Sequence, residues 1–263
     1  MSDREGRSGE ESSGSGFARE VADLREAVAG RGLLIGIDGP SGSGKSTVSK
    51  RIATDLGLSF LETGAMYRAL TWKCLTSGVD VGDPTAVLEE ADELAFESVG
   101  TVANPKFLVG GEDVTNALRS VDVAAKVSVV AGYIPVRNWM ARAQREEMLR
   151  ARYDGRGMIA EGRDVTTVVC PDADVRILLL ADPDARLRRR VLETYGHVTE
   201  DLLEQTRELV SGRDETDSKV SSFLEAAPGV IAVDSSAKSV DEVVEVVISH
   251  VGEWVAVGVE SRA

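Results

Sequence analysis

Short, continuous apolar runs alternate with amphipathic stretches through most of this chain. Such runs are typical of strands buried on both faces, and five of them occur: LLIGI (33–37), LSFLE (58–62), GMIAE (157–161), VRILLL (175–180) and GVIAV (229–233). Helical patterns separate the runs, for example KSTVSKRIATDL directly after the glycine-rich loop that follows the first run. Because parallel strands need long crossover connections, this alternation predicts an α/β fold with a parallel sheet.

The N-terminal end of the chain follows a different pattern. Residues 1–16 are rich in serine, glycine and charge and have no apolar partners, which predicts a disordered tail. Phe17, Val21, Leu24 and Val28 then recur at helical spacing. We expect a short amphipathic helix here that docks on the core, with a dimer contact as the alternative.

The last predicted helix begins with a capping box, Ser239-Val240-Asp241-Glu242. After it, Val243, Val247 and Val251 fall on one helical face. That face is expected to pack on the sheet.

One segment breaks the alternation of strands and helices. Residues 94–115 favour strand, and the sequence KFLV-Gly110-Gly111-EDVT predicts an antiparallel hairpin with its turn at the two glycines. A β-rich insert inside a parallel α/β domain suggests a separate substrate-binding lobe.

Composition and charge narrow the function classes. The 263 residues suit one large domain or one domain with inserts. A formal net charge of −14 repels polyphosphate backbones, so we expect no general nucleic-acid role. No apolar run reaches the roughly 20 residues that span a bilayer, and residues 1–16 lack the apolar region of a secretory signal. Cys74 and Cys170 have no paired spacing, so we expect a reduced, cytoplasmic protein without a membrane partner.

The strongest chemical signal is a complete phosphate-binding loop between a predicted strand and a predicted helix. Its glycines let backbone N–H groups turn toward phosphate, and the helix that follows adds its positive N-terminal end. The side chain of Lys45 suits the β- and γ-phosphates of ATP, and the hydroxyl of Ser46 suits Mg²⁺. The nucleotide-binding residues expected from the motif are Gly39, Pro40, Ser41, Gly42, Ser43, Gly44, Lys45, Ser46 and Thr47.

This loop alone does not separate kinases from other ATPases or GTPases. The chain has no NKxD motif for guanine, and it is compact for a motor ATPase. Its scattered arginines favour a kinase, because arginine grips phosphoryl groups well. Glu161, Arg163 and Asp164 stand out among the polar residues because they lie at the end of a buried strand, where open α/β sheets bind ligands. The arginine candidates are Arg68, Arg137, Arg163, Arg213 and the run 186–190.

Several segments, in unbroken order, are similar to the bacterial cytidylate kinase family of P-loop nucleoside monophosphate kinases. They are GIDGPSGSGKSTVSKRIA, LETGAMYRALT, GEDVTNALR, AEGRDVTTVVCPDADVRILLLADPDARLRRR and GRDETDS. The resemblance implies a three-layer fold with helices on both faces of the sheet, a β-rich monophosphate-binding insert and a helical lid. It places an N-terminal segment over 1–30, a kinase domain over 31–253 with the insert at about 80–118 and the lid at about 191–220, and a tail over 254–263.

The resemblance implies ATP-dependent phosphorylation of CMP or dCMP by a magnesium-using monomer. It gives Lys45, Arg163 and Arg213 catalytic roles, Ser46 and Glu161 the metal, and Arg190 the ATP adenine. The acceptor nucleotide is assigned to Thr63, Arg68, Ser128, Arg137, Arg163, Asp164, Arg213 and Asp217.

Two positions depart from the family pattern. Val220 stands where the family usually has arginine, and Thr166 stands where it usually has glycine. These departures leave two alternatives open, a kinase of a modified cytidine monophosphate or of another small acceptor. A nucleotide-binding regulatory protein without catalysis is a third reading.

Overall fold

A five-stranded parallel sheet forms the centre of the molecule, in the order β2-β6-β1-β7-β8. The structure is a computed structural model that describes residues 7–207 and 224–260. All five predicted strands are confirmed within two residues of their expected bounds. They are β1 (Leu34–Asp38), β2 (Ser59–Glu62), β6 (Met158–Gly162), β7 (Val175–Leu180) and β8 (Ile231–Asp234).

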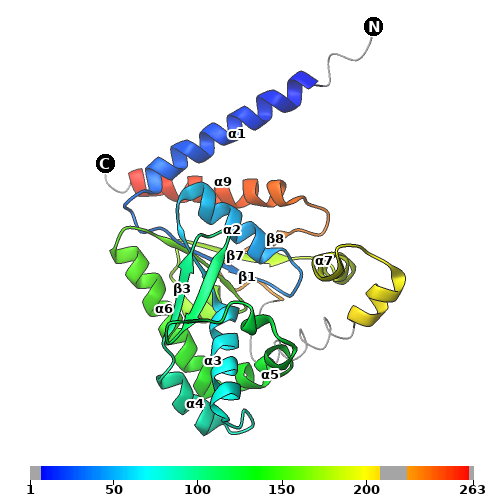
Figure 1. Ribbon diagram of the computed structural model, residues 1–263. Coiled ribbons are helices and arrows are strands. Elements are labelled where there is room, and N and C mark those ends of the chain that lie inside the picture. The colour runs from blue at the N-terminus through cyan, green and yellow to red at the C-terminus, as the bar shows by residue number, and fades with distance from the viewer. Residues whose placement is uncertain (1–6, 208–223, 261–263) are drawn as a thin grey trace.

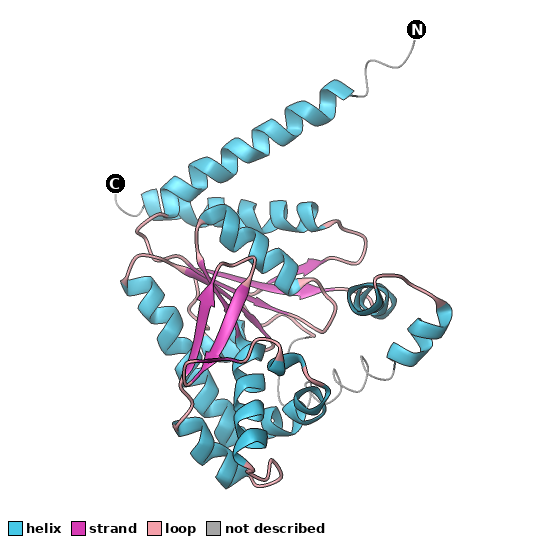
Figure 2. Ribbon diagram, in the orientation of Figure 1, coloured by secondary structure: helices cyan, strands magenta, loops and turns pink. Residues whose placement is uncertain are grey.

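Helices cover both faces of this sheet, as predicted for the fold class, and the three layers can be followed in Figure 2. One face carries α1 (Arg7–Val28), α2 (Lys45–Leu56) and α9 (Val240–Glu260). The other face carries α3 (Thr63–Ser77), α6 (Ile134–Tyr153) and, beyond them, α4 (Pro84–Asp92). Strand β1 is buried along its whole length because Ile35 and Ile37 pack toward the first set and Leu34 packs toward the second.

The N-terminal helix is longer than the sequence pattern predicts. We expected disorder over 1–16, but α1 begins at Arg7. Its C-terminal half is anchored, because Leu24 and Val28 are buried with α2 and α9. Once an anchored turn exists, each further residue adds a helical hydrogen bond, which favours continuation of the helix toward the N-terminus. The N-terminal part of α1 projects away from the body in Figure 1.

The capping box before α9 is confirmed. Ser239 N donates to Glu242 Oε2 at 2.7 Å, and Glu242 N donates to Ser239 Oγ at 3.2 Å. The valines at 243, 247 and 251 are all buried against the sheet, as their spacing predicts.

The insert forms a separate three-stranded antiparallel sheet, which lies in front of the central sheet in Figure 1. Its strands are β3 (Phe96–Gly100), β4 (Pro105–Val109) and β5 (Glu112–Asp113). The predicted hairpin is confirmed: Gly110 and Gly111 join β4 to β5 with φ angles of 57° and 85°. Both angles are in the left-handed region, which favours glycine. The insert packs on α3 through Phe107 and Val109.

Shorter elements complete the two sides of the molecule. A 3₁₀ turn η1 (Ala117–Arg119) and α5 (Val121–Gly132) lead from the insert to α6, and η2 (Val165–Val169) follows β6. Helix α7 (Pro183–Tyr195) packs against a helical segment over 200–207 through Leu187, Val191 and Leu203. Of the predicted lid, about 191–220, residues 208–220 lie outside the described residues. Within 7–207 and 224–260, none of the helices combines the length and hydrophobicity needed to cross a bilayer.

Candidate active site

The phosphate loop connects the end of β1 to the start of α2, as the motif requires. Its backbone turns tightly through Gly42 and Gly44, with φ angles of 76° and 93°. A Cβ atom added at Gly42 would lie 2.7 Å from the carbonyl oxygen of Arg186, so a larger residue would clash there. Helix α2 begins at Lys45, directly after the loop. The positive end of a twelve-residue helix is thus available to an anion held by the loop.

Lys45, Ser46 and Ser43 are the polar side chains of the loop and the start of α2 whose surroundings bear on phosphate binding. Lys45 is buried, and its Nζ donates to the carbonyl oxygen of Pro40 at 2.8 Å. Ser46 Oγ donates to Glu161 Oε1, on the neighbouring β6, at 2.6 Å. The hydroxyl of Ser43 is buried and has no hydrogen-bond partner within 7–207 and 224–260.

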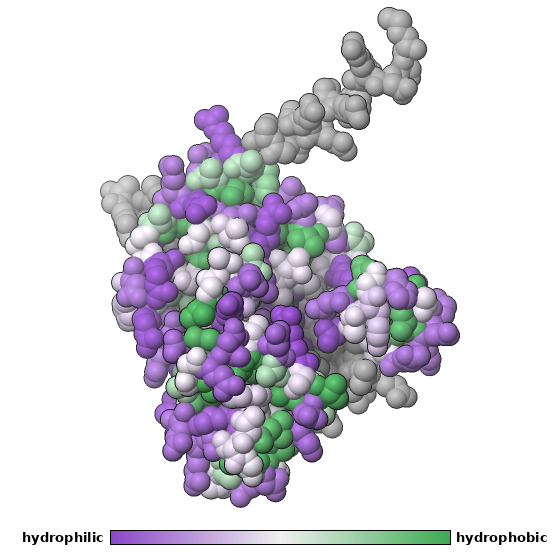
Figure 3. All heavy atoms as spheres, viewed as in Figure 1, coloured by the Kyte–Doolittle hydropathy of each residue, from purple (hydrophilic) through white to green (hydrophobic). Residues whose placement is uncertain are grey.

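A cavity of about 570 Å³ opens beyond the carboxyl ends of β2, β6 and β1. The register of the strands explains why loops meet there, because Glu62 pairs with Glu161 and Asp38 pairs with Gly162. Figure 3 shows hydrophilic residues gathered where the body meets the lobe that carries α7. The predicted site residues that line the cavity are Ser41, Gly42, Lys45, Ser46, Thr63, Arg68, Ser128, Arg137, Glu161, Arg163, Asp164 and Arg190.

A largely buried ion pair lines this cavity. The guanidinium of Arg137, on α6, bonds to the carboxylate of Asp164, which follows β6. Arg137 also donates to the carbonyl oxygen of Ala131 at 3.3 Å. Ser128, on α5, lines the same region. The pair therefore places a hydrogen-bond acceptor, the Asp164 carboxylate, beside hydrogen-bond donors, the N–H groups of Arg137.

Two further arginines are placed by backbone carbonyl groups. Arg163 Nη1 donates to the carbonyl oxygen of Gly39 at 2.8 Å, which joins the segment after β6 to the phosphate loop. Arg68 Nη1 donates to the carbonyl oxygen of Leu118 at 3.2 Å, which joins α3 to η1. Thr63 Oγ1, in the first turn of α3, donates to the carbonyl oxygen of Glu161 at 2.8 Å.

Some predicted residues lie away from the cavity lining. Thr47 is exposed on α2, and Gly39, Pro40, Ser43 and Gly44 form the body of the loop rather than the cavity wall. Arg190 reaches the cavity from α7 and pairs with Glu193 at 2.9 Å. Arg213, Asp217 and Val220 lie outside the described residues.

The structure also brings charged residues to the cavity that the sequence reasoning missed: Lys50, Glu62, Arg119 and Glu193. Glu62 could have been found, because it ends the apolar run LSFLE (58–62) as Glu161 ends GMIAE (157–161). Burial and the charge of Glu161 raise the pKa of Glu62. Arg119 lies in the GEDVTNALR segment, but nothing in its spacing separates it from a surface arginine.

Asp38 was also missed by the sequence reasoning, and it is almost fully buried at the end of β1. Its Oδ1 accepts from Val165 N at 2.9 Å, and its Oδ2 accepts from Thr166 N at 2.7 Å and Thr166 Oγ1 at 2.6 Å. Burial raises the pKa of Asp38 to about 6, against these hydrogen bonds, which lower the pKa.

The raised pKa of Asp38 predicts a specific pH dependence of stability. The folded protein holds this proton more tightly than the unfolded chain, so protonation of Asp38 stabilises the fold as pH falls through about 6, and this contribution is lost as pH rises. Between about pH 7.5 and about pH 5, the free energy of unfolding of the wild type should gain about 1 kcal/mol relative to Asp38→Asn. Urea titrations of both proteins measure this difference. A difference that stays constant with pH would contradict the prediction.

Comparisons with known proteins agree on one family. The cytidylate kinase family model matches residues 35–253. A cytidylate kinase from Streptomyces griseus is 41% identical over 220 residues, which cover 83% of this chain and 92% of that protein. One from Cutibacterium acnes is 41% identical and covers 83% and 96%, and one from Geobacillus kaustophilus is 39% identical and covers 85% and 98%.

Proposed function

This chain belongs to the cytidylate kinase family, and we propose that its cavity transfers the γ-phosphoryl group of ATP to CMP or dCMP, giving ADP and CDP or dCDP. The observation that carries the proposal is the position of Arg163 and Asp164. Arg163 bonds to the phosphate loop at Gly39, and the next residue, Asp164, bonds to Arg137 in the lining of the same cavity. The proposed donor-phosphate site and the proposed site for the base therefore line the same cavity.

Charge stabilisation accounts for the proposed chemistry. Phosphoryl transfer passes through a loose transition state, so a protein contributes mainly positioning and positive charge. Lys45 is close to the loop that would hold the donor phosphates, and Arg163 lies between that loop and the acceptor side. We assign catalytic roles to Lys45 and Arg163, and to Arg213 from the family pattern alone. Arg190 is proposed to lie over the ATP adenine.

The donor set at the loop fits a magnesium ion. A serine hydroxyl and a carboxylate oxygen lie 2.6 Å apart at Ser46 and Glu161, and oxygen ligands of this kind suit Mg²⁺. We propose that these two residues hold the ion, directly or through water. When bound, Mg²⁺ neutralises charge on the donor phosphates. The buried Ser43 hydroxyl, which has no hydrogen-bond partner within 7–207 and 224–260, suggests that the loop is built to meet a further polar group.

The acceptor site is proposed to read the cytosine ring. Cytosine presents an exocyclic amine beside a ring nitrogen and a carbonyl oxygen, so it needs one acceptor and neighbouring donors. The Asp164 carboxylate can accept from the amine, and Arg137 and Ser128 can donate to the other atoms. Arg68 and Thr63 are proposed to contact the nucleotide near its 5′-phosphate, and Asp217 its ribose. The match to the cytidylate kinase family model and to the cytidylate kinases named above favours CMP over a modified cytidylate or another small acceptor.

The remaining assignments concern the whole molecule. We propose that residues of about 80–118 form the acceptor lobe and that about 191–220 form a lid over ATP, within a kinase domain over 31–253. A lid would exclude water and prevent futile hydrolysis. The net charge of −14 disfavours polyanions such as nucleic acid. We infer a cytoplasmic monomer that acts on small nucleotides.

The products of the reaction test this proposal. With ATP, Mg²⁺ and CMP, we expect ADP and CDP to accumulate in equal amounts, resolved by ion-exchange chromatography. Without CMP, ADP formation should fall to a small fraction of that rate, because bulk water is a poor substitute for an oriented acceptor. Release of inorganic phosphate without CDP would instead identify an ATPase.

A further inference from the structure

Thr166 occupies a position that the proposed function does not explain. It follows Asp164 by two residues, and the family pattern usually has glycine there. The backbone does not require glycine at this position, because among the described residues only glycines have positive φ angles. Thr166 is 2% exposed, and its hydroxyl donates to Asp38 Oδ2 at 2.6 Å.

Asp38 and Gly39 together hold the chain on both sides of Asp164. Before Asp164, the guanidinium of Arg163 is bonded to the Gly39 carbonyl oxygen at 2.8 Å. After Asp164, the N–H groups of Val165 and Thr166 are bonded to the Asp38 carboxylate at 2.9 and 2.7 Å. The end of β1 is fully buried between β6 and β7, so it is a rigid anchor for this segment.

From this geometry we propose that Thr166 is a positioning residue for acceptor specificity: its hydroxyl locks the Asp38 carboxylate onto the segment that aims Asp164 at the cytosine ring. The inference rests on the proposed function, because it assigns Thr166 to the same acceptor site. Thr166 does not line the cavity and acts through Asp38 and Asp164.

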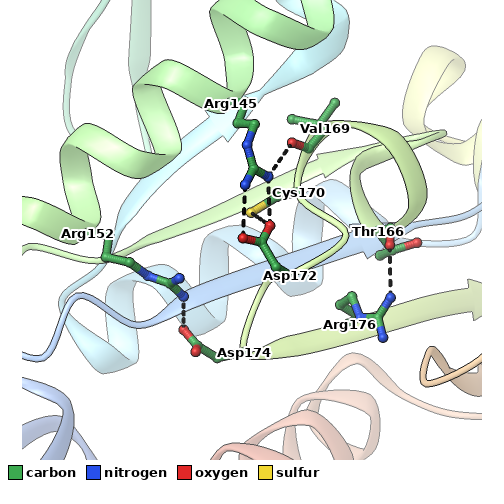
Figure 4. A network of polar contacts seen from close by, with 8 residues as sticks. All are labelled: Arg145, Arg152, Thr166, Val169, Cys170, Asp172, Asp174 and Arg176. Carbon is green, nitrogen blue, oxygen red and sulfur yellow. Dashed lines mark hydrogen bonds and ion pairs between the residues drawn. The ribbon is translucent and has the colours of Figure 1, made fainter.

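The side chain of Thr166 is fixed in the orientation that this role needs. Its methyl group faces β1, where a Cβ atom added at Gly36 would lie 3.2 Å from Thr166 Cγ2. Its carbonyl oxygen accepts from Arg176 Nη1, on β7, at 3.3 Å, as Figure 4 shows. Packing of the methyl group therefore keeps the hydroxyl on the side of Asp38, and the Arg176 contact fixes the backbone of Thr166.

Loss of the Thr166 hydroxyl should destabilise the ionised carboxylate of Asp38, because that carboxylate is buried. Without the hydroxyl, Asp38 Oδ2 keeps only the N–H of Thr166, and a buried charge that loses a donor is costly. The nearby charge of Asp164 already raises the pKa of Asp38, and Arg137 is bonded to that neighbour. Two further charged groups come from neighbouring elements: Arg163, after β6, is bonded to the carbonyl oxygen of Gly39, and Arg176, on β7, is bonded to the carbonyl oxygen of Thr166. A valine at 166 should therefore raise the pKa of Asp38 further and loosen the segment around Asp164.

Steady-state kinetics of Thr166→Val and Thr166→Ser test the inference. Valine keeps the shape of threonine without the hydroxyl, and we expect its KM for CMP to rise about fivefold to tenfold, as the loss of one buried hydrogen bond implies. The KM for ATP should stay within about twofold. Serine keeps the hydroxyl and should restore the KM for CMP. In the pH profile of kcat/KM for CMP, the fall on the acidic side should move to higher pH in the valine variant only, because only that variant raises the pKa of Asp38.

A matched control is Thr76→Val, which removes an exposed hydroxyl that bonds within α3, and it should leave both KM values unchanged. If Thr166→Val does not fold, Thr166→Ala carries the same expectation. The inference would be overturned by an unchanged KM for CMP in a folded variant. It would also be overturned if the KM values for CMP and ATP rose equally and serine did not reverse the rise. Neither outcome would contradict the proposed function. A wild type that does not phosphorylate CMP would overturn the proposed function and this inference with it.

Discussion

Replacing Lys45 with alanine is expected to lower kcat for phosphoryl transfer by about 10²–10³, the typical cost of removing one group that stabilises transition-state charge. Lys45 is buried at the start of α2, with its ammonium 2.8 Å from the carbonyl oxygen of Pro40 inside the phosphate loop. Alanine is a good helix former, so α2 should persist. The melting temperature should change little, while single-turnover rates with ATP and CMP should collapse.

Lys106→Ala is the matched control for this experiment. Lys106 is an exposed lysine on β4 whose ammonium lies 3.9 Å from Asp113, a separation at which an exposed ion pair contributes little. Its loss should leave kcat unchanged. Near-normal activity of Lys45→Ala at an unchanged melting temperature would show that the loop does not serve the transfer.

Asp164→Asn is expected to lower kcat/KM for CMP by about 10²-fold while changing the slow reaction with AMP little. The carboxylate is the proposed acceptor for the cytosine amine, and a hydrogen bond with a charged group contributes about 1.5–3 kcal/mol, which corresponds to roughly 10- to 150-fold. Asparagine keeps an oxygen for Arg137, so the buried guanidinium retains a partner. The ratio of kcat/KM for CMP to kcat/KM for AMP should therefore fall, while the protein stays folded.

A control for this change is Asp172→Asn. Asp172 forms a two-point ion pair with Arg145, at 2.6 and 2.9 Å, and Figure 4 shows the pair beside Cys170. Its side chain is about half exposed and does not line the cavity. The variant should keep the activity and base preference of the wild type. If Asp164→Asn also keeps full preference for CMP, the assignment of the base-reading site is wrong.

The sequence allowed the central sheet to be predicted because the pattern there is local and strong. Strand β7 was predicted at its observed bounds, and helix α2 also matches residue for residue. Continuous apolar runs mark strands covered on both faces, and the glycine pair at 110–111 marks a turn that needs two positive φ angles. In each case the deciding information lies within a few neighbouring residues.

The parts that could not be predicted depend on contacts between distant residues. Asp38 bonds to Val165 and Thr166, which lie 127 and 128 positions away, and only the register of β1 against β6 and β7 brings them together. The N-terminal extension of α1 is missed for a similar reason. Residues 7–16 have no apolar pattern, and their helix continues from turns that are anchored further along by Leu24 and Val28.

The most direct test of the proposed function is the rate of ADP release with ATP, Mg²⁺ and each of five acceptors in turn: CMP, dCMP, UMP, AMP and GMP. A site that pairs buried polar groups with one base rejects bases that leave those groups unpaired, by about 10⁴ in favourable cases. If Asp164 and Arg137 read the base as proposed, kcat/KM for CMP and dCMP should exceed the values for the other three by orders of magnitude. Equal rates with AMP and CMP would contradict the account.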